Sequence, residues 1–130
     1  MYELPDDFDA DLLSGCYLEM VSFGICMTRL DFSRPQLVPG VAPYGVSVGI
    51  EGGLVYAVGS VTGRREFSNS MSSAPLLDFL LKDVALVERL ENSTLKIVFG
   101  SGDAIVVEGD NNGGFESYTI SLNSGEMIVV

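Results

Sequence analysis

The chain repeats one pattern of strands and glycine-containing turns, and this repeat constrains the fold more than any other feature of the sequence. Val46–Val58 aligns with Tyr118–Val130, since both read as an alternating strand, a turn with glycine and an apolar strand. Upstream, Leu12–Phe32 aligns with Leu80–Phe99 on the same plan. A repeat of roughly 70 residues indicates one strand-rich unit used twice. We therefore expect a single domain over residues 1–130, with a pseudo-repeat at about 12–60 and 80–130 and a polar, serine-rich link at 61–75.

Runs of alternating apolar and polar residues, separated by turn residues, predict antiparallel hairpins. The expected hairpin turns are Phe23-Gly24, Gly52-Gly53, Asn92-Ser93 and Asn123–Gly125. A further strand is expected at Ala104–Glu108, and short helical segments within the first residues and at Leu76–Lys82. Together these elements predict a mainly β fold, in which two similar hairpin-rich halves form an antiparallel β-sandwich or flattened barrel with one or two short helices.

The charge balance is strongly acidic, with 18 acidic and 7 basic residues and a net charge of −11. Such a surface repels nucleic acids and anionic membranes, whose recognition depends on basic patches. It favours a basic protein partner, and it also serves to keep a small protein soluble. The chain has no histidine, which excludes Ser-His-Asp and Cys-His catalysis within it and removes the commonest transition-metal ligand. We expect neither enzymatic activity nor a cofactor.

The two cysteines are expected to stay reduced. In the first predicted hairpin Val21 faces Cys26, whereas Cys16 faces Asp31 on the other side of the sheet. Since successive side chains alternate between faces, the two thiols would point apart and could not bridge. The N-terminus lacks the basic and apolar regions of a signal peptide, and no apolar run approaches the ~18 residues of a membrane span. The sequence therefore favours a cytoplasmic protein.

Two groups of side-chain oxygen atoms are candidates for a metal site. Asp7, Asp9 and Asp11 alternate as in a calcium loop, but the central glycine and the distant glutamate of such a loop are missing. A second group gathers near two turns and comprises Asp103, Glu108, Asp110, Asn111 and Asn112. Turn chemistry explains the second group equally well, because asparagine and glycine tolerate positive φ. We expect no metal site in either place.

Glu19 and Glu88 become equivalent when the turns of the first and third predicted hairpins are superposed. Each interrupts an otherwise apolar face, which in the second copy is formed by Leu86 and Leu90. Two carboxylates brought together by pseudo-symmetry would suit acid–base catalysis or a small ligand. Alternatively, each carboxylate lies at the edge of the core and pairs with an arginine or a hydroxyl. The second interpretation is preferred, because nothing in the sequence supplies a substrate pocket or an oxyanion stabiliser.

The second half of the chain resembles a loose group of small, uncharacterised bacterial β-rich proteins, some of which are immunity-protein-like. The resemblance covers roughly residues 76–130, and more faintly 12–60, and it rests on Leu80-Leu81, Leu95–Asp103, Ile105–Gly109, Glu116–Ile120 and Ile128–Val130. Proteins of this kind bind and block one cognate toxin, often a basic nuclease. The resemblance implies a non-enzymatic inhibitor and transfers no functional residues, because its motifs consist of strand and turn residues.

These observations predict an acidic protein-binding domain that masks a basic toxin or another basic protein. The candidate partner-binding residues are Asp7, Asp9, Asp103, Glu108, Asp110, Phe115 and Glu116. Two alternatives remain open. The first is a self-associating module, for example a homodimer, that pairs through an apolar edge strand such as Glu126–Val130. The second is a small-ligand-binding domain that uses Glu19 and Glu88.

Overall fold

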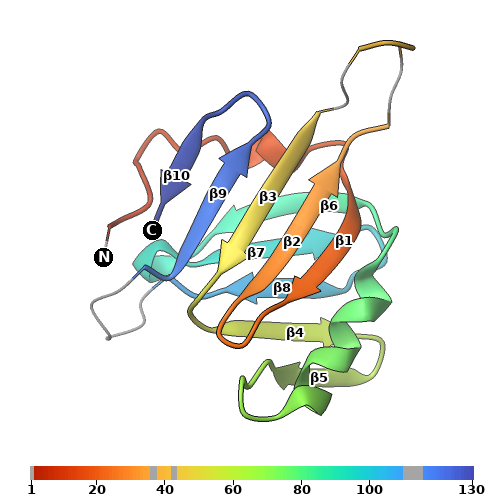
Figure 1. Ribbon diagram of the computed structural model, residues 1–130, viewed down its shortest axis with the longest axis vertical. Helices are drawn as coiled ribbons and strands as arrows, with labels where there is room; N and C mark the ends of the chain where they lie inside the picture. Colours follow the sequence, from red (N-terminus) through yellow and green to blue (C-terminus); the bar gives the residue numbers. More distant parts are fainter. Residues whose placement is uncertain (1, 36–37, 42–43, 110–115) are drawn as a thin grey trace.

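The computed structural model describes residues 2–35, 38–41, 44–109 and 116–130, and it shows two packed five-stranded antiparallel sheets (Figure 1). Sheet A has the order β1-β2-β3-β9-β10, formed by β1 (Tyr17–Phe23), β2 (Thr28–Ser33), β3 (Gly45–Ile50), β9 (Tyr118–Leu122) and β10 (Met127–Val129). Sheet B has the order β5-β4-β8-β7-β6, formed by β5 (Val61–Arg64), β4 (Leu54–Val58), β8 (Ala104–Val107), β7 (Leu95–Phe99) and β6 (Val84–Arg89). The 3-10 helices are η1 (Ala10–Leu13), η2 (Ser70–Phe79) and η3 (Glu91–Ser93). The predicted mainly β sandwich is confirmed, and over the described residues the sheets do not close into a barrel.

The two sheets are built alike. β1, β2 and β3 adjoin one another and continue into β9 and β10, just as β6, β7 and β8 continue into β4 and β5. Exchanging the sheets therefore superposes β1 on β6, β2 on β7, β3 on β8, β4 on β9 and β5 on β10. Both first strands carry an irregularity at the same place, between Leu18 and Met20 in β1 and between Val84 and Leu86 in β6. The first strands also meet at one side of the sandwich, where Tyr17 bridges to Asp83.

The second predicted hairpin is wrong, because β3 and β4 lie in different sheets. Both edges of β3 are occupied, by β2 on one side and β9 on the other, so that no edge is left for β4. Gly52 and Gly53 instead carry the chain from one sheet to the other. The N–H groups of Glu51 and Gly52 both donate to the carbonyl of Ser117, each over 2.9 Å. The alignment of residues 46–58 with residues 118–130 thus matched a connection between sheets to the hairpin β9–β10.

The first hairpin turns later than predicted, because the pairing of β1 with β2 continues to Phe23 opposite Thr28. The predicted opposition of Cys16 and Asp31 is wrong, since Asp31 pairs with Met20. Cys16 is buried, Cys26 is exposed, and both are free thiols. Cys16 immediately precedes β1, whereas Cys26 lies in the turn between β1 and β2.

The third hairpin forms, but its faces differ from the prediction. The irregularity at Ala85 turns Leu86 outward, where it pairs with Val98 and is 46% exposed. Leu90 is 39% exposed beyond the end of the strand. The expected burial of both leucines is therefore wrong, because one extra residue in a strand exchanges the faces of all that follow.

Residues 61–75, expected to link the two halves, form β5 and the first part of η2. Polar side chains hold this segment, since Asn69 accepts from the N–H of Met71 and Ser72 Oγ accepts from the N–H of Glu66 over 2.7 Å. Such local bonds are typical of serine and asparagine at helix starts. η2 consequently begins before the predicted helix and contains Pro75. Among the described residues no helix is both long and apolar enough to cross a membrane.

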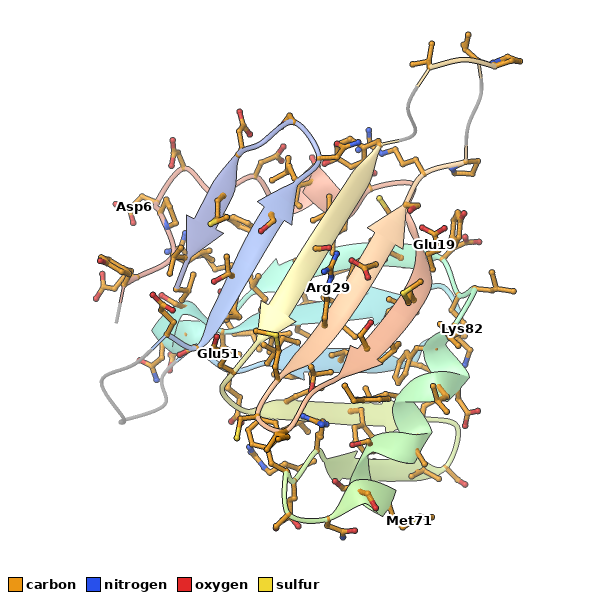
Figure 2. The ribbon with its side chains drawn as sticks, in the orientation of Figure 1. Asp6, Glu19, Arg29, Glu51, Met71 and Lys82 are labelled. Atoms are coloured by element: carbon orange, nitrogen blue, oxygen red, sulfur yellow. The ribbon has the colours of Figure 1, made fainter. Side chains whose placement is uncertain are left out.

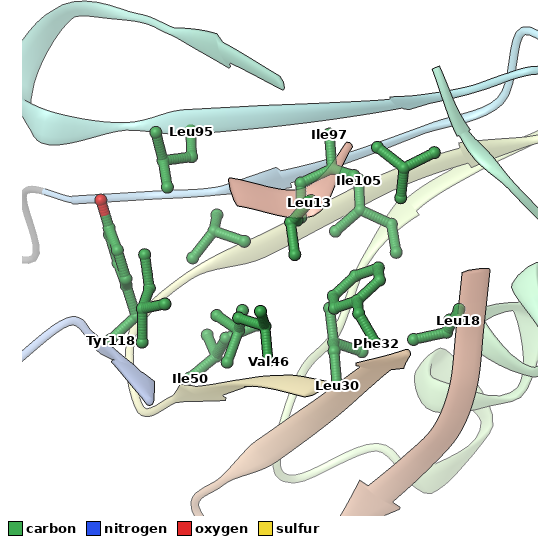
Figure 3. Close-up of a cluster of buried hydrophobic side chains, with 14 of the residues drawn as sticks. Leu13, Leu18, Leu30, Phe32, Val46, Ile50, Leu95, Ile97, Ile105 and Tyr118 are labelled. Carbon is green, nitrogen blue, oxygen red and sulfur yellow. The ribbon is translucent and has the colours of Figure 1, made fainter. Parts of the chain in front are cut away.

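The core lies between the sheets and is completed by side chains from the helices (Figure 3). η1 packs beside β6 and buries Leu12 and Leu13, whereas η2 packs beside β1, β4 and β5 and buries Leu76 and Phe79. Figure 3 shows Leu13 between the two layers of strand side chains. The helix before each first strand thus covers apolar surface that the sheets alone would leave exposed.

Candidate functional site

One end of the sandwich gathers four segments that are distant in sequence. The N–H of Leu4 donates to Ser93 Oγ over 2.9 Å, the hydroxyl of Tyr118 donates to the carbonyl of Ser93 over 2.7 Å, and Ser117 Oγ donates to the carbonyl of Gly109 over 2.5 Å. Asp6 and Glu51 both project on this side of the molecule (Figure 2). We call it the acidic end and assign to it the described carboxylates within or next to the joined segments, which are those of Glu3, Asp6, Asp7, Glu51, Glu91, Glu108 and Glu116.

The structure brings together only some of the predicted partner-binding residues. Asp7, Glu108 and Glu116 belong to the acidic end. Asp9 instead caps η1, where its carboxylate accepts from the N–H of Asp11 over 2.9 Å. Asp103 lies at the opposite end of β8 from Glu108. Asp110 and Phe115 fall outside the described residues.

The carboxylate of Glu108 is fixed by an arginine from the neighbouring part of sheet B. Its Oε1 atom lies 2.5 Å from Nη1 of Arg64 on β5. This hydrogen bond raises the pKa of Arg64. The carboxylate reaches this position by passing over Gly53, where a Cβ would lie 1.9 Å from Oε1. Glu108 is therefore held in one orientation and part of its charge is balanced.

Asp103 ties together three turns at the other end of β8. Its carboxylate accepts from Nζ of Lys82 over 2.6 Å, from Ser101 Oγ over 2.7 Å and from the N–H of Gly59 over 2.9 Å. The hydrogen bond from Lys82 contributes most to lowering the pKa of Asp103, from 3.8 to about 2. A carboxylate with these partners stabilises the fold and has little capacity left for a second protein.

The low pKa of Asp103 predicts a loss of stability in acid. Its folded-state pKa lies below the usual value, so its stabilising effect is complete above pH 3.8 and is lost as the pH falls through about 2. We expect the thermal midpoint of the wild-type protein to fall more steeply between these pH values than that of Asp103→Asn. Differential scanning calorimetry across this range measures both slopes. Asp78→Asn, at an exposed carboxylate without an ion pair among the described residues, is the matched control and should keep the wild-type slope. Equal slopes for wild type and Asp103→Asn would contradict the assignment.

Glu19 and Glu88 do not form a pair. Glu19 lies on the irregular part of β1, whereas Glu88 faces Lys96 on the outer face of sheet B. The strands that carry them meet at Tyr17 and Asp83 and then run apart. Counted along the strands, about seven residues separate the two carboxylates, which corresponds to about 20 Å. The structural equivalent of Glu19 is Ala85, since both mark the irregularity of a first strand. Within the described residues no group of acidic or cysteine side chains is placed to hold a metal ion.

The outer face of sheet A carries a groove of about 650 Å³ that sequence reasoning missed. Two rows of paired residues cross this face, Ser22–Arg29–Gly49–Thr119–Val129 and Met20–Asp31–Ser47–Ser121–Met127. Gly45, Ser47 and Gly49 of β3 line the groove and form a floor of small residues. The larger side chains of β1 and β2 form a wall beside it. The signal in the sequence is the alternation of these small residues with the buried valines and isoleucine of the same strand.

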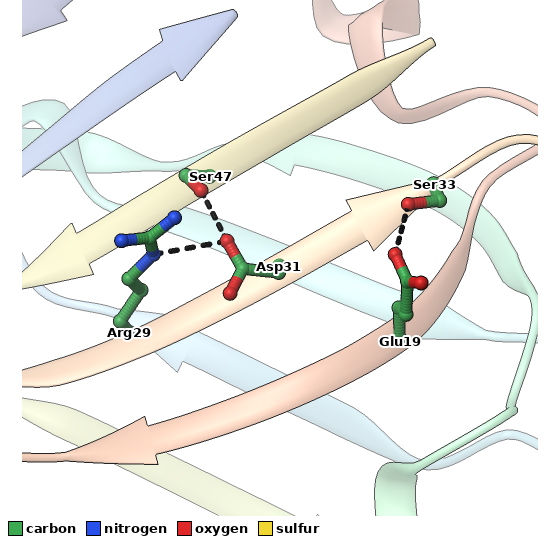
Figure 4. Close-up of polar contacts among 5 residues, drawn as sticks. All are labelled: Glu19, Arg29, Asp31, Ser33 and Ser47. Carbon is green, nitrogen blue, oxygen red and sulfur yellow. Dashed lines mark hydrogen bonds and ion pairs between the residues drawn. The ribbon is translucent and has the colours of Figure 1, made fainter. Parts of the chain in front are cut away.

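Polar contacts along this wall are made within the face (Figure 4). Asp31 accepts from Nε of Arg29 over 3.0 Å and from the hydroxyl of Ser47, and Glu19 accepts from the hydroxyl of Ser33. Arg29 therefore balances the charge of Asp31. Glu19 makes no ion pair among the described residues and keeps a net negative charge on the wall.

Most of the basic side chains are engaged by the chain itself. Ion pairs join Arg29 to Asp31, Arg64 to Glu108, Lys82 to Asp103 and Arg89 to Asp6. Arg34 donates to the carbonyl of Ser14 and lies over the ring of Tyr44, and Arg65 donates to the carbonyls of Gly24 and Met27. The four ion-paired cations each balance one carboxylate, whereas Arg34 and Arg65 keep their positive charge. The carboxylates outnumber the cations and make the field that an approaching molecule meets negative overall.

A comparison of the chain with protein-family models, with curated proteins and with solved structures found no match.

Proposed function

We propose that this chain is an acidic protein-binding domain whose partner is a basic protein, and that it masks this partner as an immunity protein masks a toxin. The observation that carries the proposal is the acidic end. Its carboxylates come from segments that are far apart in sequence and are held together by the contacts of Ser93, Gly109 and Ser117. Arg89 also lies at this end, where its guanidinium donates to the carbonyls of Leu4 and Pro5 and lies 4.0 Å from the carboxylate of Asp6, whose charge it balances.

A concentrated acidic surface accelerates the approach of a basic protein and orients it on arrival. Glu108 is already fixed by Arg64, so that ordering this side chain costs little when a partner binds. We expect the domain to inhibit its partner by steric masking, that is, by covering the partner's surface.

Neutralising the acidic end is expected to weaken partner binding by at least about tenfold and to flatten its salt dependence. The test begins with a tagged pull-down from the source organism's lysate at low and high salt, followed by expression of the captured basic protein. Its affinity is then measured by isothermal titration calorimetry against the wild type and an acidic-end variant. That variant carries Glu3→Gln, Asp7→Asn, Glu91→Gln and Glu116→Gln, all at exposed positions.

The matched control removes the same number of exposed carboxylates elsewhere, through Glu66→Gln, Asp78→Asn, Asp83→Asn and Glu126→Gln. It should bind within about twofold of the wild type, since it changes net charge without touching the contact surface. Equal loss in both variants would refute the assignment to the acidic end. Recovery of only untagged copies of the chain would contradict the proposal and indicate self-association instead. β10 would allow this, because it is an edge strand of sheet A and its Met127 is 63% exposed.

A further inference from the structure

We propose that the groove on the outer face of sheet A binds an extended segment of the basic partner that contains a lysine or arginine. This inference rests on the proposed function and adds a second contact surface to it. Glu19 and Arg29 project from this face toward the viewer in Figure 2, away from the core. The acidic end and the groove would then engage one partner at two places.

The glycines of the groove floor are not required by the fold. Neither Gly45 nor Gly49 has a positive φ. A Cβ at Gly49 would meet its nearest neighbour, Met27 Cε, at 3.9 Å, and a Cβ at Gly45 would meet the carbonyl of Phe32 at 3.7 Å, which are ordinary contacts. Glycine within a central strand weakens the sheet, and it commonly marks a place where a ligand or another chain approaches closely.

The chain contains its own comparison, because sheet B has a valine at the position equivalent to Gly49. In sheet A, Gly49 pairs with Arg29 and Thr119. At the equivalent place in sheet B, Val106 pairs with Lys96 and Val55. Ser47 and Ser121 of sheet A likewise correspond to Ala104 and Ala57. The architecture therefore accepts valine in place of Gly49, and at these three positions only sheet A has a glycine and two hydroxyl groups.

The shape of the groove favours a chain segment over a small molecule. From Gly45 to Gly49 the floor is about 13 Å long, the length of four extended residues. Sites for small molecules enclose most of the ligand surface. This groove lies on the open face of a sheet and is walled by β1 and β2 on one side. An extended segment can lie along β3 while the rest of its protein stays outside.

The charges of the wall favour a cationic side chain on that segment. Glu19 receives a hydroxyl hydrogen bond from Ser33 and has no cation beside it among the described residues. Met20 and Met27 also line the groove, and their flexible thioether side chains suit the aliphatic stem of a lysine or arginine. The net charge of −11 opposes an acidic segment.

The test selects peptides with a phage-displayed random dodecapeptide library on the immobilised full chain. Selected peptides are synthesised, and their affinities are measured by fluorescence polarisation. We expect enrichment of lysine or arginine and at least a tenfold loss of affinity for Gly49→Val, whose thermal midpoint should equal or exceed that of the wild type. Glu19→Gln should reduce the preference for a peptide with lysine over the same peptide with alanine. Ala57→Val, which places the same valine side chain on the exposed face of sheet B, is the control and should bind as the wild type does.

Peptides that bind Gly49→Val and the wild type equally, a selection without basic residues, or no enrichment at all would overturn the groove assignment. These outcomes are distinct from failure of the proposed function. If the basic partner still binds through the acidic end while the groove takes no peptide, only this inference fails. If no basic partner binds the chain at all, the proposed function fails whatever the peptides do, and the inference fails with it.

Discussion

Replacing Phe79 by alanine is expected to lower the free energy of unfolding by about 3–5 kcal/mol. Phe79 is the last residue of η2 and is completely buried. Its ring centroid lies 5.0 Å from that of Phe99 on β7. The substitution removes both the transfer free energy of the ring and its contacts, and it leaves a cavity where η2 meets the sheets. Urea denaturation followed by circular dichroism measures the change.

Leu77→Ala provides the control, because Leu77 lies on the same helix and is 50% exposed. We expect a change below about 1 kcal/mol, as for other surface substitutions. Similar small effects of both substitutions would show that η2 does not contribute to the core. A large effect of Phe79→Ala alone would show that the segment after the serine-rich stretch is an integral part of the sandwich.

The sequence predicted strands well where burial alternates strictly, as in β3 and β7. It could not predict which strands pair. Val46–Ile50 and Leu54–Val58 have the same alternation whether they form a hairpin or enter two sheets, because both arrangements bury the same side chains. What excludes the hairpin is the occupation of both edges of β3, and one of those edges is taken by β9, far along the chain.

Irregular residues in β1 and β6 are a second reason why the sequence did not predict which side chains face the core. Nothing in the composition of β1 or β6 marks Glu19 or Ala85 as an extra residue, yet each changes which side chains face the core. The predicted apolar face with Leu86 failed for this reason. The predicted equivalence of Glu19 with Glu88 failed because it superposed the turns of the two hairpins, whereas the paired strands align Glu88 with Ser22. A strand's faces are known from sequence only if its register is uninterrupted.

The sequence predicted the candidate site only in part, because contacts between distant segments decide which carboxylates are available. The acidic character of the chain is a property of composition, and it led to Asp7, Glu108 and Glu116. The ion pair of Asp103 with Lys82, which removes Asp103 from the candidate surface, depends on a contact between distant turns. The groove required knowledge that β3 is central and that its small residues face outward together with those of β9.

Gly109→Ala is expected to destabilise the protein by about 3 kcal/mol, at the upper end of the usual cost of overpacking. Gly109 is buried and lacks a positive φ, so space alone requires glycine there. A Cβ at this position would lie 2.3 Å from the carbonyl oxygens of both Asn92 and Ser93. These obstacles are backbone atoms of a turn whose residues have φ values of 58° and 57°, and they cannot rotate away as side chains do.

The same substitution should loosen the acidic end, because the β6–β7 turn organises it. Displacing Ser93 removes the acceptor of the Tyr118 hydroxyl and the acceptor of the Leu4 N–H. We therefore expect weaker partner binding together with lower stability, measured by urea denaturation and by calorimetric titration of the captured protein. Gly49→Ala is the control for stability, since its Cβ meets nothing closer than 3.9 Å and should leave the free energy of unfolding unchanged or raised. If Gly109→Ala is as stable as the wild type, the β6–β7 turn moves aside without a change in the free energy of unfolding. That result would contradict the role of this turn in holding the acidic end together.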